Sequence, residues 1–289
     1  MLPQDTDGLT MKLIVEPEGG IGPILDAIDE AKRTIDILIF RLDCKSVTRS
    51  LEKAVARGVR VRALIASKHR GGADDLRRLE RRLLRAGVVL ARTAGDLTRY
   101  HGKMMIVDRR ILHVYGFNYT RQDYESRSFG VVTTRPALVK EALALFEADA
   151  ARQHYRPRHE HFVVSPVNSR ERLSAFIRGA RRELLIYDPR FTDRAIGTLL
   201  ARRTEDGVTV RVIGKAHRRI RALLEVRKYK GFRLHVRAIV RDGQDAFVGS
   251  QSLGRMAFED RREIGLIVRD ADIARRIRSI FQRDWVSGG

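Results

Sequence analysis

The chain has 289 residues, 43% of them hydrophobic, which is enough for one large domain or two smaller ones and excludes a largely disordered protein. Its single cysteine, Cys44, excludes an internal disulfide framework, and no apolar run reaches the roughly 18–20 residues of a membrane span. Lysine and arginine outnumber the acids by 57 to 36, a net charge of +21 that favours an anionic partner, either nucleic acid or an acidic membrane surface.

The N-terminal residues 1–20 are expected to form a lead-in rather than a targeting segment. They lack the basic stretch followed by an apolar run that marks a secretory signal. The sequence therefore predicts a cytoplasmic protein, with peripheral association with an acidic membrane surface as a further expectation from its charge. The rest of the chain divides into a first half at residues 21–155, a linker at 156–168 and a second half at 169–289.

The first half alternates helical and β-rich segments. A helix over Ile24–Lys32 precedes a β-branched run over Ile35–Phe40, which predicts a buried strand. The next segment spaces apolar residues four apart and ends at Gly58, where glycine is the expected signal for the end of a helix, before a second strand that runs to Ile65. A third helix then has an inner apolar stripe of Leu76, Leu79 and Leu83.

The second half repeats this order. A helix over Arg172–Arg181 precedes a strand at Glu183–Tyr187, and a further helix ends at Gly207 before a strand that runs to Ile213. Another helix is expected next, and two strands and a long closing helix complete each half. The repeat predicts an α/β protein of two homologous halves packed as a pseudo-dimer, with mixed sheets and the helices outside.

In both halves the second strand runs into a basic loop, at Lys68–Arg70 and at Lys215–Arg218. Loops that leave strand ends in α/β sheets often border ligand sites. Each loop is therefore either a phosphate-attracting segment or a solvated turn, and the sequence leaves both interpretations open.

A short motif occurs once in each half, on the first of the two later strands. His101-Gly102-Lys103 is followed five residues after the lysine by Asp108, and His235-Val236-Arg237 is followed at the same distance by Asp242. Residues two apart on a strand point to the same face, so each histidine projects together with a cation. We expect the two aspartates to be structural, tying strand ends to turns. A second cluster lies downstream of each motif, at Tyr115–Asn118 and at Gly249–Ser252.

Two histidines with two permanent cations suit phosphodiester chemistry, provided that the halves converge on one pocket. One neutral imidazole attacks phosphorus, and the other, protonated, gives its proton to the leaving oxygen. Lys103 and Arg237 stabilise charge on the non-bridging oxygens, and Asn118 and Ser252 are candidate phosphate-binding residues. The scheme requires no metal and no cofactor, because Lys103 and Arg237 stabilise the phosphoryl charge that metal ions stabilise in other enzymes.

The doubled motif resembles the phospholipase D superfamily, whose members carry a His-x-Lys motif with a downstream Asp and a Gly-Ser-x-Asn-like element in each half. The resemblance covers residues 21–289. It implies a phosphohistidine intermediate in a phospholipase D-like or cardiolipin synthase-like enzyme. Glu263 lies where the family often places an acid that orients a histidine, fixing its tautomer.

Several positions depart from the family pattern. Arg237 replaces a lysine and Ser252 an asparagine, while Ser128 occupies the place of the first half's orienting acid, for which Glu125 or Asp123 is a possible substitute. These departures suit either an asymmetric site with divided roles or a site that binds without turnover. We assign His101 as the nucleophile, because its motif keeps both Lys103 and Asn118, and His235 as the general acid. The reverse assignment stays open, since Glu263 could mark His235 as the activated histidine.

The sequence specifies the substrate less closely than it specifies the reaction type. The favoured function is hydrolysis or transfer of a phospholipid headgroup at an acidic membrane surface. The alternatives are a metal-independent nuclease whose arginines neutralise backbone phosphates, and a degenerate phosphate-binding relative with little turnover. Because one chain carries both motifs, we expect the monomer to be active.

Overall fold

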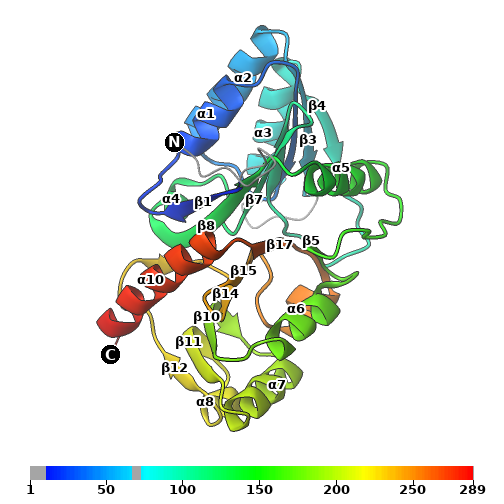
Figure 1. The fold of residues 1–289 in the computed structure, drawn as a ribbon. Helices are drawn as coiled ribbons and strands as arrows, with labels where there is room; N and C mark the ends of the chain where they lie inside the picture. The colour runs from blue at the N-terminus through cyan, green and yellow to red at the C-terminus, as the bar shows by residue number, and fades with distance from the viewer. Residues whose placement is uncertain (1–10, 67–72, 289) are drawn as a thin grey trace.

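A computed structural model of the chain describes residues 11–66 and 73–288 and consists of two stacked α/β halves (Figure 1). The first half contains β1 (Met11–Glu16), α1 (Gly22–Asp29), β2 (Thr34–Ile39), α2 (Lys45–Ala56), β3 (Arg60–Ile65), α3 (Ala73–Arg85), β4 (Val89–Arg92), β5 (Arg99–Tyr100), β6 (Met104–Val107), β7 (Ile111–Tyr115), α4 (Arg121–Tyr124), β8 (Ser126–Thr133) and α5 (Pro136–Ala150).

The second half follows the same plan. It contains β9 (Phe162–Val164), α6 (Ser169–Arg178), β10 (Glu183–Phe191), α7 (Arg194–Glu205), β11 (Thr209–Ala216), α8 (Arg218–Arg221), β12 (Glu225–Arg227), β13 (Arg233–Leu234), β14 (Ala238–Arg241), β15 (Asp245–Gly249), α9 (Arg255–Glu259), β16 (Arg261–Arg262), β17 (Ile264–Arg269) and α10 (Ala271–Ser287).

The two large sheets share one strand order. The first runs β1-β8-β7-β6-β2-β3-β4 and the second runs β9-β17-β15-β14-β10-β11-β12 in the corresponding direction. In each sheet one group of strands is parallel and the rest are antiparallel, as in β2·β3 against β2·β6. The predicted mixed sheets and repeated halves are therefore confirmed.

The strands and helices form where apolar residues repeat at the right period. Strand β2 is buried along nearly its whole length, because its isoleucines pack in one cluster with α1 and α2 while Leu38 packs in the core shared with the second half. Helix α2 buries Val47, Leu51 and Ala54 on one face. Gly58 and Gly207 follow α2 and α7 with φ values of 88° and 84°. These left-handed conformations suit glycine and end both helices as the sequence predicts.

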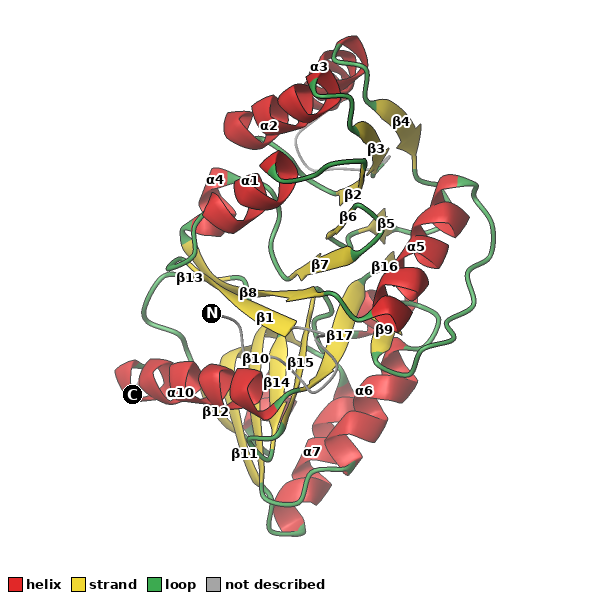
Figure 2. Ribbon diagram, turned by 45° about the horizontal axis from the view of Figure 1, so that its top comes forward, coloured by secondary structure: helices red, strands yellow, loops and turns green. Residues whose placement is uncertain are grey.

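The halves pack through a shared core with the helices on the outside (Figure 2). One cluster of buried side chains joins Leu38, Met104 and Phe129 of the first half to Tyr187 and Leu266 of the second. Burial of apolar surface is the dominant stabilising term in folding, so this continuous cluster makes the halves one folding unit. The expected pseudo-dimer is thus a single packed body.

Some segments differ from the sequence-based outline. Residues 11–16 pair with β8, and residues 162–164 pair with β17, so each sheet gains one strand from outside the boundaries drawn above. The helix expected after β11 is only the single turn α8. The basic loop Lys68–Arg70 lies outside the described residues. Along 11–66 and 73–288, no helix is both long enough and apolar enough to span a bilayer.

Candidate active site

A cavity of about 350 Å³ lies between the two halves and contains both motif histidines. Elements of each half line it, and none of the described residues that line it is acidic. The cavity is therefore a strongly basic site built by the pseudo-dimer. The residues that line it are Phe40, Arg41, Arg99, His101, Asn118, Pro189, Arg190, Thr192, Arg233, Leu234, His235, Arg237, Ser252, Gly254, Met256, Ala257 and Arg261.

Each histidine directly follows a two-residue strand that pairs with the other half. Strand β5 runs parallel to β16, and the amides of His101 and Gly102 donate to the carbonyl of Arg262 at 2.7 and 2.8 Å. Strand β13 runs parallel to β8, and the amide of His235 donates to the carbonyl of Arg127 at 3.0 Å. The backbone of each histidine is thus fixed by the opposite half.

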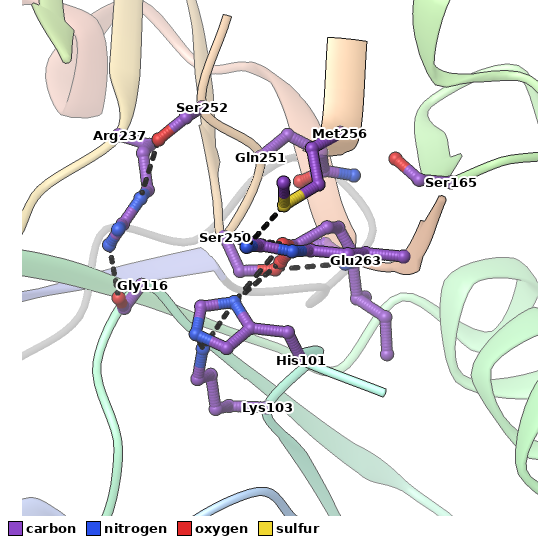
Figure 3. A network of polar contacts seen from close by, with 12 residues as sticks. His101, Lys103, Gly116, Ser165, Arg237, Ser250, Gln251, Ser252, Met256 and Glu263 are labelled. Carbon is purple, nitrogen blue, oxygen red and sulfur yellow. Dashed lines mark hydrogen bonds and ion pairs between the residues drawn. The ribbon is translucent and has the colours of Figure 1, made fainter. Parts of the chain in front are cut away.

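The acids that contact the histidines are crossed between the halves in the same way. His101 Nδ1 lies 2.9 and 3.1 Å from the two carboxylate oxygens of Glu263 (Figure 3). His235 Nδ1 lies 2.5 Å from Asp123 Oδ1. A carboxylate only accepts hydrogen bonds, so Glu263 holds the neutral ring of His101 with its proton on Nδ1 and leaves Nε2 as the basic nitrogen. At His235 the carboxylate of Asp123 lies close to Nδ1 as an ion-pair contact, without the geometry of a hydrogen bond.

The two motif cations differ in their surroundings. Lys103 is fully buried, and its Nζ lies 3.0 Å from both ring nitrogens of His101. The guanidinium of Arg237 donates to Ser252 Oγ at 3.2 Å and to the His235 carbonyl at 2.7 Å, and it reaches Gly116 of the first half at 3.5 Å (Figure 3). Lys103 is therefore buried against His101 and is not among the residues that line the cavity, whereas Arg237 lines the cavity as a planar fork held by its hydrogen bonds.

Burial governs the protonation of the site. It lowers the pKa of His101 to about 3 and that of His235 to about 4, and nearby cations add to the effect while Glu263 and Asp123 oppose it. Burial likewise lowers the pKa of Lys103 to about 7. Burial raises the pKa of Glu263, but its interactions with His101, Lys103 and Ser250 outweigh burial and bring it to about 2. Both imidazoles are thus neutral at neutral pH until an anion enters.

The other residues singled out in the sequence are placed as follows. Asn118 lines the cavity. Its side-chain amide donates a hydrogen bond to Asp123 Oδ2 at 2.9 Å. Asp108 accepts from the amides of Lys32, Arg33 and Thr34 at 2.6–2.9 Å. Asp242 accepts in the same way from the amides of residues 181–183. Both aspartates tie strand ends to neighbouring chain and do not line the cavity.

Sequence reasoning did not single out the arginines that rim the cavity. A basic residue stands two positions before each histidine, at Arg99 and Arg233, and this spacing was the available signal. Three further arginines come from separate segments, at Arg41, Arg190 and Arg261. Among the described side chains, no group of three or more His, Cys, Asp or Glu residues is placed to hold a metal ion.

The chain is similar to known proteins in sequence and in fold. A model of the family described as "Cardiolipin synthase, PLD-like domain" matches residues 24–150 and 173–285, which together include both motifs. A search of curated proteins gave no match.

Solved structures share the fold at low identity. Polyphosphate kinase from Porphyromonas gingivalis superposes with a TM-score of 0.77 at 20% identity, covering 94% of this chain and 50% of the kinase chain. Phosphatidylserine synthase from Haemophilus influenzae superposes with a TM-score of 0.72 at 11% identity, covering 96% of this chain and 86% of the synthase chain. The chain thus spans half the length of the kinase and most of that of the synthase.

Proposed function

Because the chain belongs to the family of cardiolipin synthase phospholipase D-like domains, we propose that it cleaves or transfers a phosphodiester through a covalent phosphohistidine on His101. The observation that carries the proposal is the pair of crossed histidine–acid contacts facing one basic cavity. A nucleophile and a general acid need such oriented imidazoles within one site.

The geometry supports a two-step reaction. With Nδ1 held by Glu263, the neutral Nε2 of His101 attacks phosphorus, and the bond to the leaving oxygen breaks as His235 gives that oxygen a proton. Lys103 and Arg237 stabilise the charge on the non-bridging oxygens. His235 then takes a proton from water or an alcohol, which attacks phosphorus and breaks the phosphorus–nitrogen bond. The entering phosphate supplies the negative charge that raises the pKa of His235 enough to load its proton.

For the substrate, we favour a phospholipid headgroup at an acidic membrane surface. The family description names a cardiolipin synthase, and a phosphatidylserine synthase shares the fold. Peripheral binding to an anionic bilayer fits a net charge of +21.

Nucleic acid is the second candidate, and the arginine rim is the observation that favours it. One phosphodiester carries a single negative charge, whereas Arg41, Arg99, Arg190, Arg233 and Arg261 line the cavity in addition to Arg237 of the second motif. An extended polyanion would use these arginines. Its binding should weaken steeply with salt, log K falling by roughly 0.9 per phosphate contacted on a duplex. Turnover measured on vesicles with and without anionic lipid, and on DNA and RNA, distinguishes the two substrate classes.

The first experiment measures turnover of bis-(p-nitrophenyl) phosphate in the presence of EDTA. Wild type should be active, because Lys103 and Arg237 supply the positive charge. His101→Asn should abolish turnover. His235→Asn should slow this substrate less than one with an alkyl alcohol as leaving group, for which general-acid help is worth about 10²–10⁴-fold. A nitrophenolate leaves without needing a proton.

Trapping of the intermediate completes the test. Quenching in alkaline denaturant preserves a phosphorus–nitrogen bond, and mass spectrometry should locate the adduct on the His101 peptide. An adduct on His235 would reverse the two roles, and complete loss of turnover in EDTA would contradict the mechanism. Neither turnover nor adduct would favour the degenerate phosphate-binding relative, and Arg237 and Ser252 would then be the first residues to revert to the family pattern.

A further inference from the structure

The first half lacks an acid at the position that carries Glu263 in the second half. The short strand pairs fix this equivalence. Arg262 of β16 pairs with Tyr100, so Glu263 and His101 are the next residues on the two chains. Arg127 of β8 pairs with Leu234, so Ser128 and His235 are the next residues there. By register, Ser128 therefore stands to His235 as Glu263 stands to His101.

Ser128 does not carry out the role of an orienting acid. Its side chain is fully buried, and its hydroxyl has no hydrogen-bond partner among the described residues. A hydroxyl also cannot supply the negative charge that stabilises an imidazolium. The symmetric position is thus buried and uncharged.

Asp123 reaches the same histidine from a different element. It lies in α4, whose N-terminal residue Thr120 both accepts from the Asp123 amide and donates its hydroxyl to Asp123 Oδ2 at 2.5 Å. Asn118 donates to the same oxygen at 2.9 Å, and Arg233 donates to Oδ1 at 3.0 Å. The carboxylate is buried and held on both oxygens, so its direction toward His235 is fixed.

These contacts also keep Asp123 ionised. Burial raises its pKa, but His235, Thr120 and Asn118 outweigh burial and hold the pKa well below its usual range. A carboxylate that stays charged can hold the Nδ1 proton of His235 and stabilise the ring when Nε2 is protonated.

We propose that Asp123 is the positioning residue for His235, replacing the acid that the first half lacks at Ser128. It fixes the ring with Nδ1–H toward the carboxylate and Nε2 toward the cavity, the arrangement that a proton donor to the leaving group needs. This rests on the proposed function, in which His235 is the general acid. The site thus has two unlike acids, one at the end of a strand pair and one on a helical turn.

The test compares Asp123→Asn with Glu125→Gln. Glu125 directly follows the same helix, and its substitution by glutamine removes the same charge. Its side chain, however, is 65% exposed and pairs with Arg121. Asp123→Asn should lower kcat by about 10²-fold or more with KM little changed, as when the acid behind a catalytic histidine is replaced by its amide. It should also shift the pH dependence of kcat for an alkyl leaving group. Glu125→Gln should leave both unchanged.

A readout that needs no turnover is the imidazole spectrum of the free protein. In wild type the Nδ1 proton of His235 should give a downfield, slowly exchanging NMR signal, assigned by its absence in His235→Asn. Asp123→Asn should lose that signal, whereas Glu125→Gln should keep it. Should wild type show no turnover on any phosphodiester, the proposed function fails, yet this signal still decides whether Asp123 holds His235.

Restoring the symmetric acid provides the second variant. Adding Ser128→Glu to Asp123→Asn should bring back the Nδ1 signal and part of the lost kcat. Circular dichroism and thermal unfolding check that the double variant is folded. The proposal is overturned if Asp123→Asn keeps both the signal and kcat within about twofold of wild type. A folded double variant that regains neither would overturn the equivalence of Ser128 and Glu263.

Discussion

A buried carboxyl without a cation lies beside the position where the first half lacks its acid. Glu16 ends β1 and is the cross-strand partner of Ser128. Its side chain is fully buried, one oxygen accepts from the Gly20 amide at 2.8 Å, and the other has no hydrogen-bond partner among the described residues. Burial raises the pKa of Glu16 to about 8, against the lowering effect of the Gly20 amide. The residue is thus protonated in the folded protein at neutral pH.

This protonation predicts a loss of stability as the pH rises from about 4.5 to about 8. Between the ordinary pKa of 4.5 and the folded value of about 8, the folded state binds more protons than the unfolded state, so the free energy of unfolding falls as pH rises. The slope is at most about 1.4 kcal/mol per pH unit. Urea unfolding at a series of pH values should show this slope in wild type and a flatter one in Glu16→Gln. Equal slopes in the two proteins would refute a buried neutral carboxyl.

Part of the site could be predicted from single residues, and part could not. His101, Lys103, His235 and Arg237 stand out in the sequence because the motif occurs twice. The expected placement of the motif on a strand is wrong, since residues 101–103 link β5 to β6 and residues 235–237 link β13 to β14. The choice between Asp123 and Glu125 was not decidable from spacing alone. Their distinction is burial, 2% exposed for Asp123 against an exposed Glu125, and burial depends on how α4 packs against the other half.

At the scale of elements, the two-residue strands β5 and β13 position the two motif histidines, although they are among the shortest strands of the protein. A motif histidine directly follows each of them, and each is paired with a strand of the opposite half. Gly102 follows the first of these histidines in a crowded place. A Cβ there would lie 2.6 and 2.7 Å from side-chain carbons of Ile264, the residue after Glu263. The absence of a side chain at Gly102 therefore lets His101 and Glu263 approach each other.

Gly102→Ala should consequently destabilise the protein and misplace His101. Overpacking of this kind costs typically about 1–3 kcal/mol. Denaturant midpoints and turnover should both fall. Gly95→Ala serves as the control, because a Cβ at Gly95 meets nothing within 4 Å. Equal behaviour of the two variants would show that Ile264 yields without cost.

The long elements could be predicted from the sequence, and the short ones largely could not. In strand β2 and helix α2 the apolar residues recur along the whole element, so their periodicity alone predicts both elements. Strand β1 is a lone run in the lead-in whose partner, β8, lies more than a hundred residues later. Helix α8 is a single arginine-rich turn in which Ile220 alone is buried, so little apolar burial supports a longer helix there.

At the scale of the molecule, the match to the cardiolipin synthase phospholipase D-like family confirms the resemblance drawn from the doubled motif. Two reciprocal ion pairs join the halves in addition to the shared core. Arg127 of β8 contacts Asp284 of α10 at 3.1 Å, and Arg262 of β16 contacts Asp149 of α5 at 2.9 Å. The arginines whose carbonyls hold the histidines are thus themselves anchored by the long closing helices.

This arrangement predicts that one chain completes one site. Light scattering during size exclusion should find activity in the fraction with the mass of a single chain, and activity per chain should stay constant on dilution. Mixing His101→Asn with His235→Asn should restore no turnover, since neither chain can lend its intact histidine to the other. Recovery of activity in the mixture would mean that sites are shared between chains.

The crossed contacts also bear on whether one half can be exchanged alone. The acid that serves each histidine is encoded in the opposite half. A substitution of either acid is therefore expected to act on a histidine of the other half, although the two halves share one strand order and each could be taken for a separate unit. Replacing one half with that of a relative would place each histidine beside an acid from a different chain, so we expect such a chimera to disturb both histidine–acid contacts at once.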